Sequence, residues 1–435
     1  MVKQLDLTMQ FIKDDALNTE IQRALLVGVY FNTQEKSTLT AYLDELEALL
    51  VNLDIQVVKK MSIPLKKIHR ATLIGKGKVE EIANLVAEEN IDMVVFDDEI
   101  LPSQQRNLEK TLKKAIVDRT EVILEVFSRH AQTKEAKLQV ELAQSQYQLP
   151  RLKRLWTHLS RQVSGGKYLK GTGEKQLEID KRLIKKRISQ LKQEIEKITN
   201  VRIIQRQKRQ KSNIPTFAIV GYTNSGKSTL LNTLTQADVL AEDRLFATLD
   251  TTTRKYTLPN HQEVLLIDTV GFIRKIPTTL VASFKSTLEE AIKAHFLIHV
   301  IDVSDPMCLE HAAQTLEVLK ELGAHNIPTI HVLNKLDLCK DHSILQQLRL
   351  KYPKTAQISA LNNEGLDRLN ELMEQELRSL RTELFLKIPQ KEYGLVCEMI
   401  ESGQVFSQEY EDHMISLHVE VPNYLAKRLE KYTFS

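Results

Sequence analysis

The sequence predicts a multidomain α/β protein built from four units. Its 435 residues exceed what one ordinary hydrophobic core accommodates. Short apolar runs alternate with helix-like segments over residues 1–130 and again over 214–377, which is the pattern of a mostly parallel sheet covered by helices. Between these α/β units, residues 131–213 are predicted to form a long antiparallel helical hairpin, and residues 378–435 a small C-terminal α+β domain.

The N-terminal α/β unit is predicted from three apolar runs and three helix-like segments. The runs are 24–30, 93–96 and 115–118, and the segments are 36–52, 78–89 and 103–114. Asp97, Asp98 and Glu99 follow the second run. Adjacent carboxylates at a strand end are expected to face solvent, with a metal site as the alternative.

The hairpin is predicted from two polar stretches, 131–148 and 174–210, that lack proline and carry periodic apolar residues. In the second stretch these are Leu177, Ile184, Ile188, Leu191, Ile195 and Ile198. Their steps of seven, four, three, four and three are typical of a coiled-coil core. The second helix should therefore pack against the first.

Positive charge is concentrated in this hairpin. Residues 151–211 carry 19 Lys and Arg against 5 Asp and Glu, a local charge of +14, so a chain of net charge +3 carries −11 elsewhere. Such a block predicts a polyanion-binding surface, the alternative being a solvated helical face. In the loop between the helices, glycines let the backbone approach phosphates and lysines neutralise charge, which favours RNA contact over a disordered loop. The expected RNA contacts are Lys167, Lys170, Gly171, Thr172, Gly173 and Lys175.

The composition argues against several classes of protein. No run of eighteen uncharged apolar residues could span a bilayer, and the N-terminus lacks a secretion signal, so we expect a cytoplasmic location. Cys308, Cys339 and Cys397 are widely spaced and odd in number, which argues against a disulfide framework or a zinc site. Nothing in the sequence demands more than a monomer.

A phosphate-binding loop opens the third unit. After the apolar run 217–220, the sequence GYTNSGKS matches G-x-x-x-x-G-K-[ST] between a strand and a helix. Its amides can wrap phosphates, Lys227 can reach the terminal phosphates, and the Ser228 hydroxyl can bind Mg²⁺. The expected nucleotide contacts here are Gly221, Tyr222, Thr223, Asn224, Ser225, Gly226, Lys227 and Ser228.

Two further elements follow this loop in order. The first is D-x-x-G, whose carboxylate can hold a magnesium-bound water and whose glycine amide can meet the γ-phosphate. It comprises Asp268, Thr269, Val270 and Gly271. The second is N-K-x-D, whose carboxylate can accept hydrogen bonds from N1–H and the exocyclic amine of guanine, which adenine does not offer. It comprises Asn334, Lys335, Leu336 and Asp337, with Ser359, Ala360 and Leu361 completing the base pocket.

These elements together predict a P-loop GTPase that hydrolyses GTP to GDP, with Lys227, Asp268 and Gly271 among its catalytic residues. Between the first two elements, Thr248 and Thr252 are both candidates for a second magnesium ligand, and spacing alone does not decide between them. The segment expected to contact GTP there comprises Phe246, Ala247, Thr248, Leu249 and Asp250.

Phe272 follows Gly271, at a position where Ras-like proteins place a water-orienting glutamine. Intrinsic hydrolysis should therefore be slow, and another residue, a partner or a cation must supply the missing element. Asn224 suggests K⁺ as an activator, because an asparagine at this loop position supports potassium binding in several GTPases that lack the glutamine. A purely structural Asn224 is the alternative.

Longer strings resemble the HflX family, of the Obg and HflX group of translational GTPases, over essentially the whole chain. They are IGKGKVEEI (74–82), VVFDDEILPSQQRNLE (94–109), the segment 117–152, FATLD (246–250) and DTVGFIRKIP (268–277). The resemblance implies that residues matching Ser228 and Thr248 hold Mg²⁺, and on this ground we prefer Thr248. It also implies that some members bind ATP through the N-terminal domain, where Gly75, Lys76, Gly77 and Lys78 form either such a site or an ordinary basic turn.

The resemblance further implies binding to the large ribosomal subunit and ribosomal RNA, with splitting or rescue of stalled ribosomes under stress. The tip loop GGKYLKGTGEKQLE departs from the family's more usual arginine-containing pattern. The alternative function is a GTP-regulated RNA-binding or RNA-remodelling factor without ribosome splitting. A signalling switch with protein partners alone fits the +14 block less well.

Overall fold

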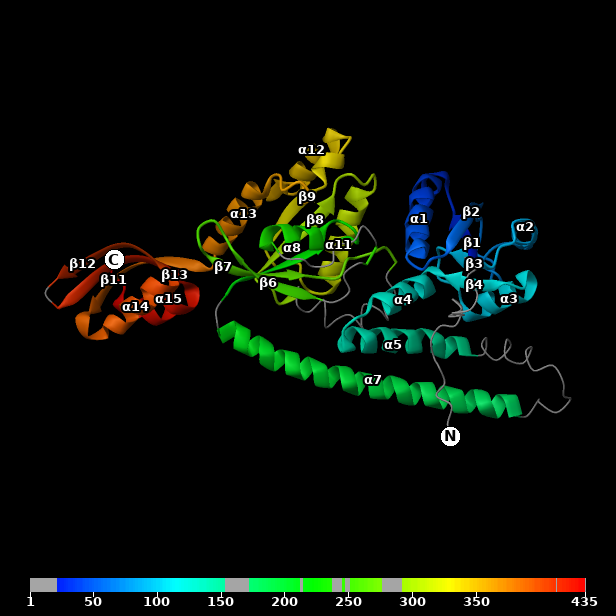
Figure 1. The fold of residues 1–435 in the computed structure, drawn as a ribbon, viewed down its shortest axis with the longest axis horizontal. Coiled ribbons are helices and arrows are strands. Elements are labelled where there is room, and N and C mark those ends of the chain that lie inside the picture. Colours follow the sequence, from blue (N-terminus) through cyan, green and yellow to red (C-terminus); the bar gives the residue numbers. More distant parts are fainter. Residues whose placement is uncertain are drawn as a thin grey trace.

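The computed structural model describes residues 22–152, 172–211, 214–236, 245–246, 251–275, 292–411 and 413–434. It confirms the predicted multidomain α/β class, with two sheets covered by helices, a long hairpin and a smaller C-terminal sheet (Figure 1). Within these ranges, no helix combines the length and apolar composition needed to cross a membrane.

The N-terminal sheet is fully parallel and has helices on both faces. Its strands are β1 (Arg23–Tyr30), β2 (Gln56–Pro64), β3 (Met93–Phe96) and β4 (Ala115–Asp118), in the order β2-β1-β3-β4. The helices α1 (Thr33–Val51) and α4 (Arg119–His130) pack on one face, and α2 (Lys76–Glu88) and α3 (Pro102–Leu112) on the other. Strand β2 was not predicted from the sequence, because this edge strand is largely half-exposed and carries lysines among its apolar residues.

The hairpin consists of α5 (Lys134–Gln148) and α7 (Thr172–Lys211). Leu138 and Leu142 of α5 form a small core with Leu191 of α7, flanked by Ile188, Ile195 and Ile198. Arg187 adds a two-pronged contact to Glu141, at 2.6 and 2.8 Å. The packing expected from the apolar steps is therefore present, and α7 runs alongside α5 and continues beyond it (Figure 1).

The GTPase-like domain has a six-stranded sheet in the order β10-β9-β8-β5-β7-β6. The strands are β5 (Thr216–Gly221), β6 (Thr252–Thr257), β7 (Glu263–Asp268), β8 (Phe296–Asp302), β9 (Thr329–Asn334) and β10 (Thr355–Gln357). Only β6 is antiparallel to its neighbour. The helices described here are α8 (Lys227–Thr235), α11 (Cys308–Glu321), α12 (His342–Lys351) and α13 (Leu366–Arg378).

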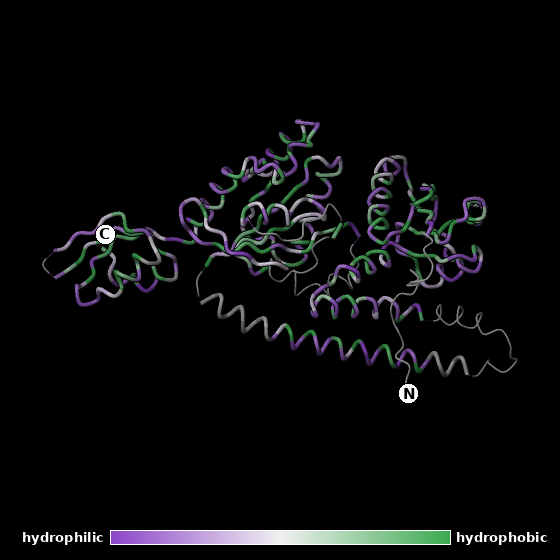
Figure 2. Tube along the Cα trace, in the orientation of Figure 1, coloured by the Kyte–Doolittle hydropathy of each residue, from purple (hydrophilic) through white to green (hydrophobic). Residues whose placement is uncertain are grey.

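The sheet interior is apolar, as the green central strands in Figure 2 show, because a parallel strand covered on both faces needs an almost continuous apolar sequence. Its strands deliver their carboxyl ends to one edge, where loops carry the predicted motifs.

The C-terminal domain is an antiparallel sheet in the order β11-β13-β12, with two helices. Its elements are β11 (Arg381–Pro389), α14 (Tyr393–Ser402), β12 (Gln404–Glu411), β13 (Met414–Pro422) and α15 (Asn423–Leu429). Sequence analysis did not predict β12, whose residues are mostly exposed.

Candidate functional site

The phosphate-binding loop joins the end of β5 to the first residue of α8. Gly226 adopts φ +90°, and a Cβ there would lie 2.2 Å from Nδ2 of Asn334. A side chain at this position would therefore collide with the base-recognition element. The loop geometry explains why glycine precedes Lys227, the first residue of α8. The N-terminus of a helix at this place can bind phosphate through its free amides.

Lys227 is buried and its Nζ donates to the carbonyl oxygen of Tyr222 at 2.8 Å. Burial lowers the pKa of Lys227 to about 8; Asp268 acts to raise it, and the positive charge of Lys335 lowers it further. An anionic neighbour stabilises the charged form of a buried ammonium whose pKa is depressed, so this lysine can bind the terminal phosphates of a nucleotide.

Ser228 and Asp268 form the candidate magnesium site. They come together because β5 and β7 are neighbouring parallel strands that place Ile219 beside Asp268. The Ser228 hydroxyl donates to Oδ2 of Asp268 at 2.6 Å. A hydroxyl and a carboxylate at a strand end are the oxygen ligands that Mg²⁺ takes up, directly or through water, so the residues present fit this metal.

Gly271 brings the D-x-x-G element against the phosphate-binding loop. A Cβ at Gly271 would lie 2.7 Å from Cα of Thr223 and 2.9 Å from Nζ of Lys227. The next residue fixes this approach, since Phe272 donates its amide to the Gly221 carbonyl at 3.0 Å and accepts from the Thr223 amide at 2.6 Å. Only glycine permits a contact this close.

The base-recognition elements are joined by side-chain hydrogen bonds. Asn334 donates to the carbonyl of Ser225 at 2.9 Å and accepts from the amide of Ala360 at 3.0 Å. The Ser359 hydroxyl donates to Oδ1 of Asp337 at 2.6 Å. The structure thus brings the loop, N-K-x-D and the residues after β10 to one site, and the exposed carboxylate of Asp337 is oriented by Ser359.

Sequence analysis missed Asp302, which lies at the end of β8 and pairs with Lys335 at 2.8 Å. Lys335 itself adopts a left-handed conformation at φ +61°. The pair holds the lysine of N-K-x-D against the sheet edge. A carboxylate directly after the apolar run 296–301 was the available signal.

The segment before Thr248 is held by the N-terminal domain. The Phe246 amide donates to Oγ1 of Thr223 at 2.9 Å, and its ring meets Phe127 of α4 edge-on, with centroids 4.5 Å apart. Asn52 donates to the carbonyl of Leu245 at 2.9 Å. The predicted residues Ala247, Thr248, Leu249 and Asp250 lie outside the described residues, so the choice between Thr248 and Thr252 stays a prediction.

The carboxylates after β3 were expected to face solvent; Glu99 is exposed and Asp98 is half-buried, but Asp97 is not exposed. Asp97 is buried, accepting from Arg119 at 3.0 Å, from Arg274 at 2.8 Å and from Lys275 at 3.2 Å. Arg119 also pairs with Glu45 of α1. Solvent exposure of Asp97 was therefore a wrong expectation, and a metal is not indicated either, since no cluster of metal-binding side chains occurs in the described ranges.

Burial by itself raises the pKa of Asp97, but the charges of Arg274 and Arg119 outweigh it and hold the pKa below its ordinary value. Arg274 and Lys275 follow Gly271 by only a few residues. The network therefore ties the N-terminal sheet to the segment that would sense the γ-phosphate. Sequence analysis quoted these residues within longer strings without predicting this contact.

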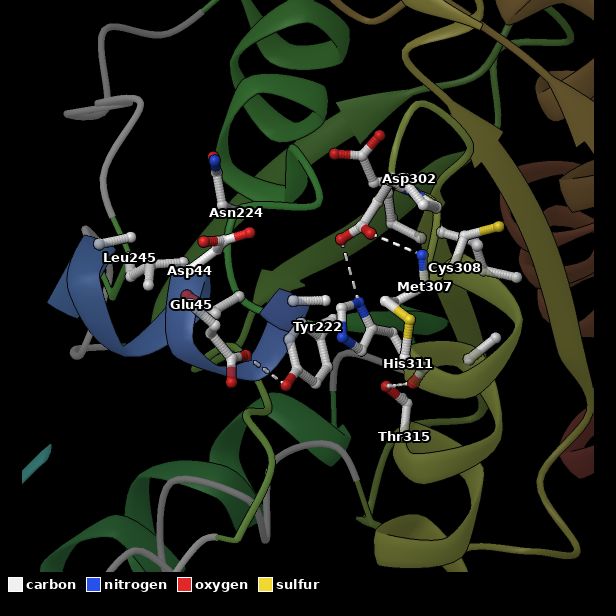
Figure 3. Close-up of a pocket in the computed structure, with 18 of the residues that line it drawn as sticks. Asp44, Glu45, Tyr222, Asn224, Leu245, Asp302, Met307, Cys308, His311 and Thr315 are labelled. Carbon is white, nitrogen blue, oxygen red and sulfur yellow. Dashed lines mark hydrogen bonds and ion pairs between the residues drawn. The ribbon is translucent and has the colours of Figure 1, made fainter. Parts of the chain in front are cut away.

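A pocket between α1 and the phosphate-binding loop is drawn in Figure 3. Tyr222 lies in it between two domains: its hydroxyl donates to Glu45, and its ring stacks on His311 with centroids 3.8 Å apart. His311 contacts Asp305 at 3.1 Å. The second residue of the loop is thereby fixed by both the N-terminal helix and α11. Burial, with the negative charge of Glu45, raises the pKa of Tyr222.

The structure tests neither RNA contact nor ATP binding at the residues predicted for them. Lys167, Lys170 and Gly171 lie outside the described residues, and Thr172, Gly173 and Lys175 enter the first turn of α7 without described side chains. The cluster Gly75–Lys78 forms the start of α2, where Lys78 pairs with Glu81 at 2.6 Å. RNA contact and ATP binding at these places stay predictions.

Comparisons with known proteins match most of the chain to GTPase families. Residues 40–128 match a family model described as GTP-binding GTPase N-terminal, residues 130–209 one described as GTP-binding GTPase middle region, and residues 216–335 one described as 50S ribosome-binding GTPase. "GTPase HflX" of Chlamydia pneumoniae is 45% identical over 94% of this chain and 88% of its own. The chain belongs to the HflX family of GTPases.

A second HflX GTPase, from Akkermansia muciniphila, is also 45% identical, over 95% of this chain and 97% of its own. Among solved structures, a GTP-binding protein from Sulfolobus solfataricus in complex with GDP is 28% identical, with a TM-score of 0.41, over 83% of this chain and 100% of its own. As an HflX-family member whose residues 216–335 match a GTPase family model, the protein is an enzyme that hydrolyses GTP.

Proposed function

We propose that this HflX-family GTPase binds the large ribosomal subunit and its RNA, and splits or rescues stalled ribosomes under stress. The observation that carries the proposal is the match of residues 216–335 to a family model described as a 50S ribosome-binding GTPase. With a ribosomal partner, we also propose a cytoplasmic location and a monomer as the acting form.

The basic helix α7 supports this proposal. With 40 residues at 1.5 Å per residue, α7 is about 60 Å long, enough to carry its loop end far from the GTPase domain. Lys185 and Lys186 are exposed, and the side chain of Arg182 is 83% exposed. Such a helix can neutralise several phosphates of an RNA. It would also bring the predicted contacts Lys167, Lys170 and Lys175 to that RNA.

In the proposed cycle, the loop 221–228 would hold GTP and Asp337 would recognise its base. Ser228 and Thr248 would hold Mg²⁺, which when bound would supply positive charge to the phosphates. Lys227 adds a second positive charge there, and the Gly271 amide meets the γ-phosphate. Because Arg274 is bonded to Asp97, movement of Gly271 on hydrolysis would reach the N-terminal domain directly.

Phe272 cannot orient the attacking water, because this side chain is buried in the core shared with Phe127 and Phe246. Asn224 adopts the left-handed conformation at φ +58° on the loop. We infer that K⁺ bound at Asn224 supplies part of the missing charge. Equal GTP turnover in potassium and sodium buffers would contradict this role.

The decisive experiment measures GTP turnover in potassium buffer with and without purified large subunits. We expect large stimulation by large subunits and little by small subunits, which serve as the matched control. In co-sedimentation, more protein should pellet with large subunits in the GTP-bound form than in the GDP-bound form. Binding that is equally strong to protein-free ribosomal RNA would instead favour an RNA-remodelling factor, and no stimulation by large subunits would overturn the proposal.

A further inference from the structure

The C-terminal sheet has one face covered by its helices and another that points away from them. Its core contains Leu386, Ile388, Ile415, Leu417, Val419 and Val421, packed with residues of α14 and α15. Both helices lie on the same side of the strands (Figure 1). Because side chains alternate along a strand, the intervening residues point to the opposite face. There Phe385 is 51% exposed and Phe406 49% exposed.

Three rings, one from each strand, lie against one another on this second face; one pair is stacked and the other is tilted by 39°. Phe385 of β11 stacks on His418 of β13 with centroids 4.2 Å apart and an interplanar angle of 11°. Phe406 of β12 lies on the other side of His418, 4.7 Å away. Phe406 reaches this position because the register of β12 shifts between Val405 and Ser407, and such a bulge re-aims a side chain.

The surroundings of this aromatic layer are acidic. Glu383 and Glu420 are directly opposite each other across the β11–β13 ladder, an arrangement that costs stability unless a cation is near. Glu409 and Glu411 lie on the same face of β12, opposite Ser416 and Met414. Three of these carboxylates have a partner on the face: Glu383 contacts the ring of His418, Glu420 lies 3.7 Å from Arg381, and Glu411 lies 3.1 Å from Lys387. Among the described residues of the face, four carboxylates therefore stand against the positive charges of Arg381 and Lys387 and the titratable ring of His418.

We propose that this face binds an arginine-bearing segment of a basic protein. A guanidinium group stacks on aromatic rings and forms two-pronged hydrogen bonds with carboxylates, so it matches both features of the face. Phosphates of a nucleic acid would meet the four glutamates and be repelled. The inference goes beyond GTP hydrolysis and ribosome binding, since it rests on the C-terminal domain's own residues and gives that domain a partner.

The test uses the full-length protein and a short fluorescent peptide that alternates arginine with glycine. Fluorescence anisotropy should detect binding that weakens at high salt, and the same peptide with lysine should bind less tightly. Phe385→Ala and the double variant E383Q/E420Q should each raise the dissociation constant about fivefold or more. Phe31→Ala, which removes a ring that is 55% exposed in the N-terminal domain, is the matched control and should leave it unchanged.

Unchanged peptide affinity in both Phe385→Ala and E383Q/E420Q would overturn the proposal. So would a loss of affinity for a single-stranded RNA oligonucleotide in Phe385→Ala, with peptide binding intact, because the face would then be a nucleic-acid surface. GTP turnover should stay at the wild-type rate in all these variants. This readout separates failure of the docking surface from failure of the nucleotide site.

Discussion

Arg274 of the GTPase domain donates to both carboxylate oxygens of Asp97, at 2.8 Å each, although 177 residues separate them in the chain. The pair lies between the segment after Gly271 and the end of strand β3. Both side chains are buried, so the Arg274 cation depends on Asp97, and the Asp97 carboxylate depends on Arg274 and Arg119. This contact directly links the nucleotide-sensing segment to the N-terminal domain.

Asp97→Asn should destabilise the protein by about 3 kcal/mol, because it leaves Arg274 and Arg119 buried without their shared counter-charge. Thermal unfolding of the nucleotide-free protein measures the effect. Asp98→Asn is the matched control, since Asp98 is more exposed and contacts Lys275 near the surface; it should cost less than about 1 kcal/mol. Equal destabilisation by the two variants would contradict the structural importance of the Asp97–Arg274 pair.

The Asp97 carboxylate also predicts how the stability of the protein depends on pH in acid. Because the pKa of Asp97 is lowered in the folded protein, its contribution to stability is full above the unfolded value of about 3.8 and is lost as pH falls through the folded value. The unfolding temperature of the wild type should therefore drop more steeply below pH 4 than that of Asp97→Asn. Parallel curves for the two proteins would argue against this titration.

Ser228→Ala should weaken GTP binding about tenfold in the presence of Mg²⁺, equivalent to about 1.4 kcal/mol, because a metal-binding hydroxyl is removed. Without Mg²⁺ the variant and the wild type should bind GTP alike. Calorimetry in magnesium and in EDTA distinguishes the two conditions. A similar loss in both would mean that Ser228 serves the loop and not the metal.

Asp337→Asn should change the preferred base from guanine to xanthine. An amide offers one donor and one acceptor where the carboxylate offers two acceptors, so guanine loses a hydrogen bond and xanthine, with a carbonyl in place of the amine, gains one. We expect GTP affinity to fall by about 100-fold and XTP affinity to rise above it. Ser359 should still orient the side chain. Retained preference for GTP would remove Asp337 from base recognition.

The depressed pKa of Lys227, about 8 in the nucleotide-free protein, gives GTP binding a pH dependence. Phosphates require the ammonium form, so affinity should be constant below pH 8 and fall above it by up to about tenfold per unit. Between pH 8 and the ordinary lysine value of 10.5 the unfolded chain binds the extra proton, so this group makes the nucleotide-free protein more stable as pH rises. Lys227→Met should bind GTP weakly, without this pH dependence.

The nucleotide site could be anticipated because its residues lie in short local patterns. Gly226, Gly271 and Asn334 stand in motifs whose geometry is set within a few residues of chain, and parallel strands bring their carboxyl ends to one edge whatever the rest of the protein does. The apolar runs of β1 and β3 and the steps of α7 were readable for the same reason, since burial on a sheet or along a helix stripe imposes a period on the sequence.

Only the tertiary structure placed Asp97 against Arg274 and Glu45 against Tyr222. These are long-range pairs of charged or polar residues in segments that each look solvent-exposed by composition, and their burial depends on how two domains pack. The aromatic layer of Phe385, His418 and Phe406 likewise required the strand register and a bulge. The sequence by itself therefore determined the chemistry of the nucleotide site. Packing between distant segments decided which other parts of the protein contact that site, because local periodicity carries no information about distant partners.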